Sequence, residues 1–323
     1  MPLPAYANNG PVDCSVKPDT GTLKGKSVVV TGGANGFGES HVRAFAAAGA
    51  FVTFGDIDEG RGKSLAGELG SSNVQFIKCD ATSWDDQLNM FKQAIAHSPA
   101  KSCDIVVANA GISGPDEVFE LGDPASEPTR PSLPILQLNL VGAFYTFKLG
   151  QHYLRVQPEG PERDRCFIFK GSLAGLLDQP GSFQYSASKF ALRGLMRSAR
   201  WTSWQAGIRV NYIAPWYTKT TILKPQVLER LVSRGIEFAE VADCTTAVLR
   251  IACDKDINDV YADDDGDALG RSLAILPRSV TANGYMDAQL DDPEEEPWKG
   301  LQSAVLAASI RTMAAATQND VVH

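Results

Sequence analysis

The 323-residue sequence has no run of about 18 apolar residues, the length that a helix needs to cross a membrane. Its first residues, MPLPAYANNG, have neither the basic start nor the apolar stretch of a secretory signal. Only four histidines are present, and the six cysteines are scattered without a C-x-x-C pair. These absences argue against a metal site and favour a reduced, cytoplasmic chain.

Basic residues are too few for a nucleic-acid-binding protein. Lys and Arg number 30 against 38 Asp and Glu, which gives a net charge of −8, whereas a nucleic-acid surface needs a basic face. Part of the acidic excess is local, in one cluster at residues 263–267 and another at residues 291–296. Acidic runs of this kind are typical of solvated loops, and we expect both clusters to be loops.

What the sequence does contain is a regular alternation of strand and helix signals. Short runs rich in Val, Ile and Phe, typical of buried parallel strands, lie at 27–31, 50–54, 74–79, 105–109, 166–169, 208–213 and 273–276. Helical segments lie between them at 36–48, 59–69, 84–97, 133–156, 184–206 and 239–252. This alternation predicts an α/β fold, a doubly wound, Rossmann-type parallel sheet of seven strands with helices on both faces.

We predict three parts along the chain. They are an irregular N-terminal arm at 1–22, a dinucleotide-binding catalytic domain at 23–276, and an acidic loop with a C-terminal helix (301–316) at 277–323. Two segments interrupt the alternation. Residues 111–134, rich in proline and glycine, predict a loop that reaches outward, and residues 215–235 follow a strand at the sheet edge where such folds bind ligands.

A glycine-rich turn, Thr31-Gly-Gly-Ala-Asn-Gly-Phe-Gly38, joins the first strand to the first helix. Such a turn lets the backbone approach a pyrophosphate at a helix N-terminus. Asp56 ends the next strand, 18 residues after Gly38, where a carboxylate grips a ribose 2′-hydroxyl. The alternative for Asp56 is a helix N-cap, for which Asp58 is the better candidate. A carboxylate at this point repels a 2′-phosphate, so NAD is favoured over NADP.

A second constellation follows the fifth strand. Ser172 ends that strand, and Tyr185 and Lys189 are four residues apart, which places them on one helix face. Tyrosine, with an ordinary pKa of about 10, is a poor base at neutral pH. A nearby ammonium group and an oxidised nicotinamide ring both favour the phenolate, so this pattern predicts a general base that works near neutral pH.

These motifs resemble those of the short-chain dehydrogenase/reductase superfamily, in the branch with T-G-x-x-x-G-x-G and Y-x-x-x-K. The longer branch would have glycine at position 35, where this chain has Asn. The resemblance covers about residues 23–276. It implies that Tyr185 transfers the proton of an alcohol, that Ser172 hydrogen-bonds the substrate oxygen, that Lys189 holds the nicotinamide ribose, and that Asn139 holds a water in the proton relay.

The resemblance also implies a set of NAD-binding residues. Asp80 contacts adenine in this scheme, Thr220 binds the nicotinamide carboxamide, and Asn109-Ala-Gly111 matches an N-A-G motif whose usual preceding Asn is Ala108 here. The full set is Gly32, Asn35, Gly36, Phe37, Gly38, Asp56, Ile57, Asp80, Ala81, Asn109, Ala110, Gly111, Tyr185, Lys189, Pro215, Thr218 and Thr220.

The substrate pocket is predicted from positions around the catalytic set. The candidates are Leu173, Leu177, Gln179, Phe183, Trp216, Tyr217 and Leu223. They are mostly apolar and aromatic, which favours a bulky, hydrophobic secondary alcohol. Trp216, which replaces the family's glycine, either forms a wall of the pocket or packs under the following loop. Residues 185–197 and 213–216 resemble NAD-dependent dehydrogenases of fungal polyketide pathways.

The sequence therefore predicts NAD-dependent oxidation of a hydrophobic secondary alcohol to a ketone, and the resemblance to fungal polyketide-pathway enzymes implies a role in fungal secondary metabolism. Two alternatives stay open, a non-redox isomerase or cyclase on the same fold and a dinucleotide-sensing binding protein. The resemblance also implies a homodimer or homotetramer that pairs through the helices at 133–156 and 184–206.

Overall fold

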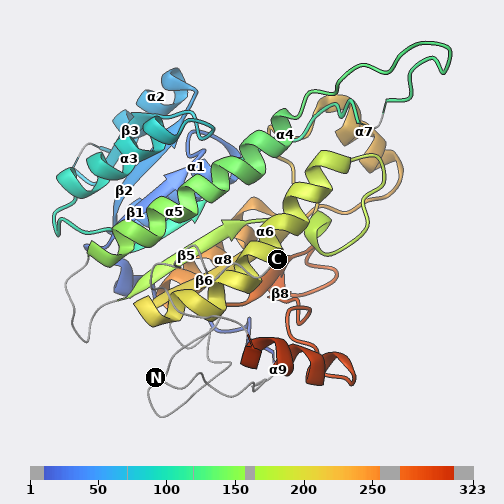
Figure 1. Ribbon diagram of the computed structural model, residues 1–323. Coiled ribbons are helices and arrows are strands. Elements are labelled where there is room, and N and C mark those ends of the chain that lie inside the picture. Colours follow the sequence, from blue (N-terminus) through green and yellow to red (C-terminus); the bar gives the residue numbers. More distant parts are fainter. Residues whose placement is uncertain (1–10, 71, 119, 157–163, 255–269, 309–323) are drawn as a thin grey trace, which may run out of the picture.

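The computed structural model describes residues 11–70, 72–118, 120–156, 164–254 and 270–308. A single sheet, ordered β3-β2-β1-β4-β5-β6-β7-β8, runs through the centre of this part of the chain (Figure 1). The strands are β1 (Ser27–Thr31), β2 (Phe51–Asp56), β3 (Val74–Lys78), β4 (Ile105–Ala108), β5 (Arg165–Lys170), β6 (Ile208–Pro215), β7 (Ser272–Ile275) and β8 (Tyr285–Asp287). The strand order reverses between β1 and β4, which is where doubly wound sheets bind ligands.

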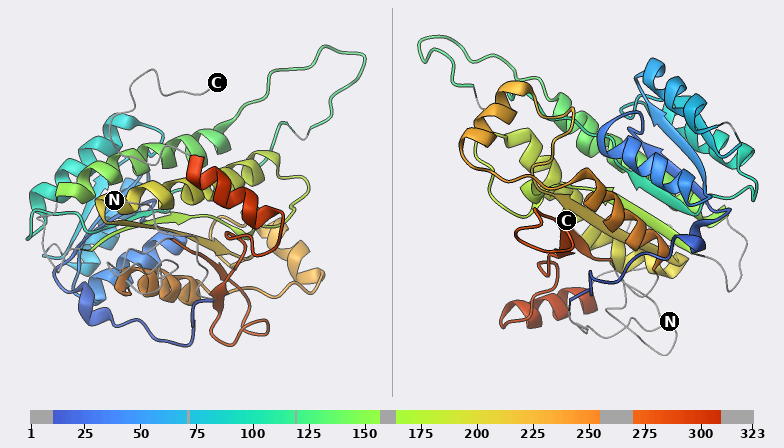
Figure 2. Two further views of the ribbon diagram at one scale, coloured as in Figure 1. Left: turned by 60° about the horizontal axis from the view of Figure 1, so that its bottom comes forward. Right: turned by 180° about the vertical axis from the view of Figure 1, so that it is seen from behind.

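Helices cover both faces of the sheet (Figures 1 and 2). The apolar residues of α1, α2 and α8 pack on one face and those of α3, α5 and α6 on the other. The helical bounds are η1 (Thr20–Leu23), α1 (Gly36–Ala47), α2 (Glu59–Leu69), α3 (Trp84–His97), α4 (Pro134–Leu136), η2 (Gln137–Gly142), α5 (Ala143–Tyr153), η3 (Leu154–Val156), η4 (Leu173–Gly175), α6 (Phe183–Ser203), η5 (Trp204–Ala206), α7 (Pro225–Ser233), α8 (Val241–Cys253) and α9 (Trp298–Ala308).

The central strands are buried on both faces, which explains their unbroken apolar sequences. In β1, Val28 and Val30 join the core on the α1 side and Val29 joins the core on the α3 side, all without solvent exposure. The doubly wound α/β class is confirmed. The sheet has one strand more than predicted, because β8 adds to its edge antiparallel to β7.

The helix expected at 133–156 is present with an interruption of its hydrogen-bond register. Between α4 and α5 lies the π-helical segment η2, which contains Asn139. Such π segments occur frequently at functional sites, because the wider turn displaces backbone groups from the regular ladder. The register change therefore falls at a candidate catalytic residue.

The second acidic cluster differs from the expected solvated loop. Asp291 accepts a hydrogen bond from Arg193 Nε at 2.8 Å, and Asp292 accepts one from Arg200 at 2.6 Å. Both carboxylates are buried against α6, because the two arginines on that helix supply the opposite charge. The first cluster, at 263–267, lies outside the described residues, as does the predicted helix beyond Ala308. Within the described residues, no helix combines the length and apolar character required to cross a membrane.

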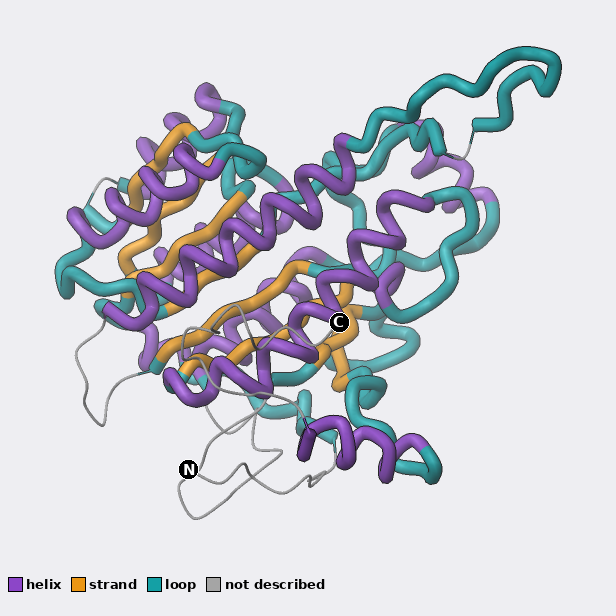
Figure 3. The backbone as a smooth tube through the Cα atoms, viewed as in Figure 1, coloured by secondary structure: helices purple, strands orange, loops and turns teal. Residues whose placement is uncertain are grey.

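The loop predicted to reach outward does so. Between β4 and α4 the chain extends away from the body of the protein, as the thin arm in Figure 2 and the long loop in Figure 3 show. Leu121, in this loop, is 98% exposed. The base of this loop, in contrast, borders the cavity described below.

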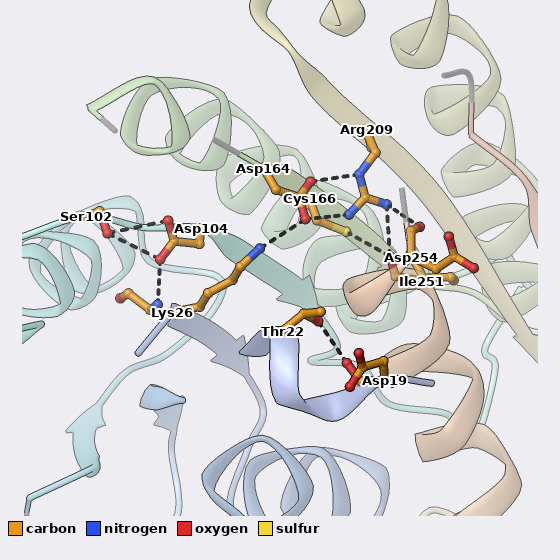
Figure 4. A network of polar contacts seen from close by, with 11 residues as sticks. Asp19, Thr22, Lys26, Ser102, Asp104, Asp164, Cys166, Arg209, Ile251 and Asp254 are labelled. Atoms are coloured by element: carbon orange, nitrogen blue, oxygen red, sulfur yellow. Dashed lines mark hydrogen bonds and ion pairs between the residues drawn. The ribbon is translucent and has the colours of Figure 1, made fainter. Parts of the chain in front are cut away.

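A buried ionic network joins the amino ends of the central strands, at the edge of the sheet away from the ligand-binding edge (Figure 4). Asp164, before β5, accepts two hydrogen bonds from Arg209 of β6, at 2.8 and 2.9 Å, and one from Lys26 at 3.3 Å. Asp104, before β4, accepts the backbone N–H of Ser27 at 2.6 Å. Burial alone would raise the pKa of Asp164, but the positive charges of Arg209 and Lys26 lower it by more. The net pKa is therefore below the ordinary value, and the carboxylate stays ionised.

Candidate active site

A cavity of about 950 Å³ opens at the carboxyl ends of the strands. The glycine-rich turn, the ends of β2 to β6, the start of α6 and part of α7 form its wall. All the candidate cofactor residues named above and the catalytic candidates Ser172, Tyr185 and Lys189 line it. The fold thus brings together residues that are spread over about 190 positions of sequence (32 to 223).

The glycine-rich turn approaches its neighbours too closely for side chains at three positions, Gly32, Gly33 and Gly38. Gly32 has φ of 65°, and a Cβ there would lie 2.8 Å from the Cα of Ala110. A Cβ on Gly38 would lie 2.0 Å from the carbonyl oxygen of Gly32. Asn35 makes no side-chain cap at the start of α1, and its amide oxygen instead accepts from Thr221 Oγ1 at 2.9 Å. This uncapped, glycine-lined helix start fits the pyrophosphate of a dinucleotide.

Asn109 ties the glycine-rich turn to β4. Its Nδ2 donates to the carbonyl oxygens of Thr31 at 3.0 Å and Gly32 at 2.9 Å. In return, Thr31 Oγ1 accepts the backbone N–H groups of Asn109 and Ala110. These four hydrogen bonds hold the turn in the shape that the cavity requires.

Asp56 lies in the cavity wall at the end of β2. Its carboxylate accepts the backbone N–H groups of Ala34 and Asp58, each at 3.0 Å. The N-cap of α2 is Asp58, whose side chain accepts from Arg61 N at 3.0 Å, so the helix-cap alternative for Asp56 is wrong. Asp56 therefore has a fixed orientation that leaves it available to a ligand in the cavity.

Ser172, Tyr185 and Lys189 converge from two elements. Ser172 is the N-cap of η4, and its Oγ accepts the backbone N–H of Ala174 at 3.1 Å. Tyr185 and Lys189 share one face of α6, with Lys189 Nζ 5.4 Å from the centre of the tyrosine ring. Lys189 Nζ also donates to the carbonyl oxygen of Lys170 at 3.0 Å. The three side chains thus border one end of the cavity, the part that we call the reactive end.

The pKa values at the reactive end follow from burial. Burial raises the pKa of Tyr185 above its ordinary value, although the hydrogen bond with Ser172 lowers it in part. Burial and the charge of Lys170 lower the pKa of Lys189 to about 7. Without a bound cofactor, Tyr185 is therefore a phenol at neutral pH. The pKa of Tyr185 is raised, whereas the sequence led us to expect that Lys189 would lower it.

Two predicted residues lie outside the cavity wall. Asn139 is buried behind it, with its amide bonded to the backbone N–H and C=O of Ile112 at 2.8 and 2.9 Å. Phe183 is 48% exposed at the start of α6 and does not line the cavity. On a helix, Phe183 is rotated by about 200° from Tyr185, which lies two residues later, so its side chain faces away from the cavity that Tyr185 lines.

Trp216 satisfies both interpretations offered for it. Its ring lines the cavity, and its Nε1 donates to the carbonyl oxygen of Glu237 at 3.0 Å, beneath the segment that follows α7. The neighbouring ring of Tyr217 packs edge-on against it, with centroids 4.9 Å apart. This pair forms an aromatic part of the cavity wall.

Sequence reasoning missed several residues of the wall. Ile135 and Leu138 come from the π-interrupted helix, Val227 and Leu231 from α7, and Asp116 from the base of the projecting loop. Sequence reasoning also missed three cations of the wall, Lys170, Lys224 and Arg230. Their positions in the sequence could have revealed some of these residues. Lys170 ends a central strand, and α7 falls in the segment predicted to lie at the ligand-binding edge of the sheet.

Asp116 caps α6 from a distance. Its carboxylate accepts the backbone N–H of Gln184 at 2.6 Å and Gln184 Nε2 at 3.0 Å. We expect Asp116→Ala to lower the free energy of unfolding by about 1–2 kcal/mol, as loss of a helix cap does, and to raise KM for substrate because the loop base borders the cavity. Denaturant unfolding and steady-state kinetics test this.

Asp123→Ala is the matched control for Asp116, because Asp123 lies on the same loop but accepts only from Ala125 in an exposed turn. Asp123→Ala should leave the free energy of unfolding and KM for substrate unchanged. If Asp116→Ala and Asp123→Ala had the same free energy of unfolding and the same KM, Asp116 would not be a cap of α6.

A short-chain dehydrogenase family model matches residues 26–230. The chain belongs to this family, whose members are oxidoreductases that use a nicotinamide dinucleotide. It is 35% identical to 5′-hydroxyaverantin dehydrogenase of Dothistroma septosporum and 34% identical to the enzyme of that name from Emericella nidulans, each match covering 88% of this chain and 92% of the relative. An NADP-dependent dehydrogenase of Cochliobolus lunatus is 31% identical, over 74% of this chain and 88% of its own length. The predicted resemblance to the family and to these fungal enzymes is confirmed.

Proposed function

We propose that the protein is an NAD-dependent dehydrogenase that oxidises a bulky, hydrophobic secondary alcohol to a ketone in fungal secondary metabolism. The observation that carries this proposal is one cavity whose wall contains Asp56 and the glycine-rich turn as well as Ser172, Tyr185 and Lys189. A site for a dinucleotide and a site for proton transfer therefore share one space. The similarity to two fungal alcohol dehydrogenases over 88% of the chain supports the same conclusion.

In this proposal the alcohol loses a hydride from carbon and a proton from oxygen. Ser172 Oγ donates a hydrogen bond to the substrate oxygen, and Tyr185 accepts the hydroxyl proton as the C=O double bond forms. When bound, NAD⁺ supplies the hydride acceptor and a positive charge that favours the phenolate of Tyr185. Lys189 binds the nicotinamide ribose, and its pKa of about 7 allows it to receive and pass a proton near neutral pH.

Asn139 has a positioning role in this scheme. Its amide fixes Ile112, and a Cβ on the adjacent Gly111 would lie 3.2 Å from Asn139 Oδ1 and 3.6 Å from Lys189 Nζ. Asn139 thus holds the backbone that packs beside the lysine. The π-helical register at Asn139 supports a water of the proton relay at that point, since a backbone carbonyl displaced from the helical ladder is available to accept from water.

The substrate class follows from the wall around the reactive end. Leu173, Leu177, Trp216, Tyr217 and Leu223 supply apolar and aromatic surface, which suits a large hydrophobic molecule. Gln179 adds one neutral polar group. The experiment is an assay of NADH formation with a panel of hydrophobic secondary alcohols, hydroxyalkyl anthraquinones included, with ketone product identified by mass spectrometry. No NADH and no ketone with any of them would contradict the proposal.

NAD is proposed over NADP because Asp56 lies in the cavity wall at the end of β2, where we expect the ribose, and residues 31–38 and 55–58 contain no Lys or Arg. We expect Asp56→Ala to raise KM for NAD⁺ at least about tenfold, because hydrogen bonds from the ribose to a carboxylate are lost, and to reduce the preference over NADP⁺ by a similar factor. Steady-state kinetics with both cofactors measure this. Asp58→Asn, which keeps a capping side chain on α2, is the control and should retain the cofactor preference; unchanged selectivity in Asp56→Ala would refute the ribose contact.

A further inference from the structure

A second buried lysine borders the reactive end of the cavity. Lys170 is the last residue of β5, two positions before Ser172, and only 7% of it is exposed. Its side chain lies on the α1 and α8 side of the sheet, where Nζ donates to Cys244 Sγ at 2.8 Å. The same Nζ is 3.3 Å from the ring centre of Phe37, which belongs to the glycine-rich turn. Both Lys170 and Phe37 line the cavity.

This lysine has no carboxylate partner among the ion pairs of the described residues. Its polar partner is a thiol, and its charge faces an aromatic ring. Burial lowers the pKa of Lys170, and the contact with Cys244 raises it in part. The nearest acidic residue in sequence to that thiol, Asp243, is paired with Arg278 at 2.7 Å. In the part of the chain that the structure describes, the ammonium group of Lys170 is therefore buried without a carboxylate countercharge.

The field of Lys170 reaches the titratable groups around it. On α6 its charge lowers the pKa of Lys189, and on α1 it contributes to a pKa of His41 that lies well below the ordinary value. Its backbone oxygen, in addition, accepts the hydrogen bond from Lys189 Nζ. Lys170 thus acts on the reactive end both through its charge and through its backbone.

We propose that Lys170 sets the preference of the site for the reduced cofactor over the oxidised one. The inference rests on the proposed function, because it requires a nicotinamide dinucleotide in this cavity. The oxidised nicotinamide carries a positive charge and the reduced ring is neutral, so a fixed cation in the wall repels only the oxidised form. A cation–π contact with Phe37 keeps the ammonium group in place without neutralising it.

The size of the effect follows from Coulomb's law. In a medium of effective dielectric constant about 20, repulsion between two nearby unit charges is of the order that changes a dissociation constant about tenfold, which is about 1.4 kcal/mol. By the thermodynamic cycle, the same tenfold factor moves the equilibrium between bound alcohol with NAD⁺ and bound ketone with NADH toward the ketone. Lys170 therefore favours oxidation of the alcohol at the cost of weaker NAD⁺ binding.

The test compares the dissociation constants of NADH and NAD⁺, the first by fluorescence and the second by competition, in the wild type and Lys170→Met. Met keeps the length of the side chain and removes the charge. We expect the ratio of the NAD⁺ constant to the NADH constant to fall about tenfold through tighter NAD⁺ binding, with NADH affinity changed by less than about twofold. Lys170→Gln is a second neutral variant, in case Met disturbs folding.

Cys244→Ala is the matched control, because it removes the thiol partner and leaves the ammonium group. It should keep the ratio of the wild type. A ratio that is unchanged in both neutral variants, or equal losses of both affinities, would overturn the assignment to Lys170 while leaving the proposed function intact. Absence of NADH binding to the wild-type protein would overturn the proposed function and this inference together.

Discussion

Replacing Tyr185 by Phe is expected to lower kcat by at least about 10³-fold while NADH affinity stays within about twofold of the wild type. The phenol oxygen is the only part removed, and in the proposed mechanism it accepts the alcohol proton, a contribution of about 10²–10⁴-fold for a general base. The ring stays in the cavity wall beside Ser172 and Lys189, so the cofactor contacts remain. Stopped-flow or steady-state NADH formation and NADH fluorescence titration measure the two quantities.

Tyr153→Phe is the control for this variant. Tyr153 lies at the end of α5, where its ring stacks on Phe91 with centroids 5.4 Å apart, and it does not line the cavity. It should retain the turnover of the wild type. If Tyr185→Phe kept more than about a tenth of that turnover, Tyr185 would not be the general base.

Replacing Arg209 by Met is expected to lower the free energy of unfolding by about 3–5 kcal/mol, the usual loss when one partner of a buried ion pair is removed. Arg209 supplies two of the hydrogen bonds to Asp164 and also donates to the carbonyl oxygens of Ile251 and Asp254 (Figure 4). Of the side-chain contacts to the Asp164 carboxylate described above, the one from Lys26 at 3.3 Å then remains. Urea unfolding at neutral pH measures the change.

Arg61→Met is the matched control, because the Arg61–Asp58 pair is exposed and such pairs contribute at most about 1 kcal/mol. The double variant Arg209→Met/Asp164→Leu should recover part of the stability, since it removes the uncompensated charge as well. Because this network lies at the edge of the sheet away from the cavity, NADH affinity of the folded Arg209→Met protein should be unchanged. A loss of less than about 1 kcal/mol would show that the network contributes little.

The sequence predicted best those parts of the fold that are encoded by residues close together in the chain. Seven strands, the glycine-rich turn and the helix with Tyr185 and Lys189 follow from apolar runs and short spacings. The eighth strand, Tyr285–Asp287, has only three residues, and Met286 between them is exposed, so it has no recognisable run. Helix α7 was missed because Pro225 begins it inside a segment interpreted as a ligand-binding loop.

The parts of the site that sequence could not predict depend on partners far along the chain. Asp116 is one acid in a loop until folding places it against Gln184, 68 positions away. Lys170 ends an apolar strand without any motif, and its contacts with Cys244 and Phe37 come from two other elements. Composition alone predicts that Asp291 and Asp292 are solvated. The arginines that bury them lie on α6, 98 and 92 positions earlier, so the local sequence gives no sign of the pairs.

The most direct test of the central claim follows the hydride itself. A hydrophobic secondary alcohol that turns over, deuterated at the carbinol carbon, is incubated with the wild-type protein and NAD⁺, and the cofactor and product are analysed by mass spectrometry. The account predicts that deuterium appears in the reduced cofactor in the same amount as ketone is formed. Product formation with no deuterium in the cofactor would contradict it and would indicate an isomerase or cyclase on the same fold.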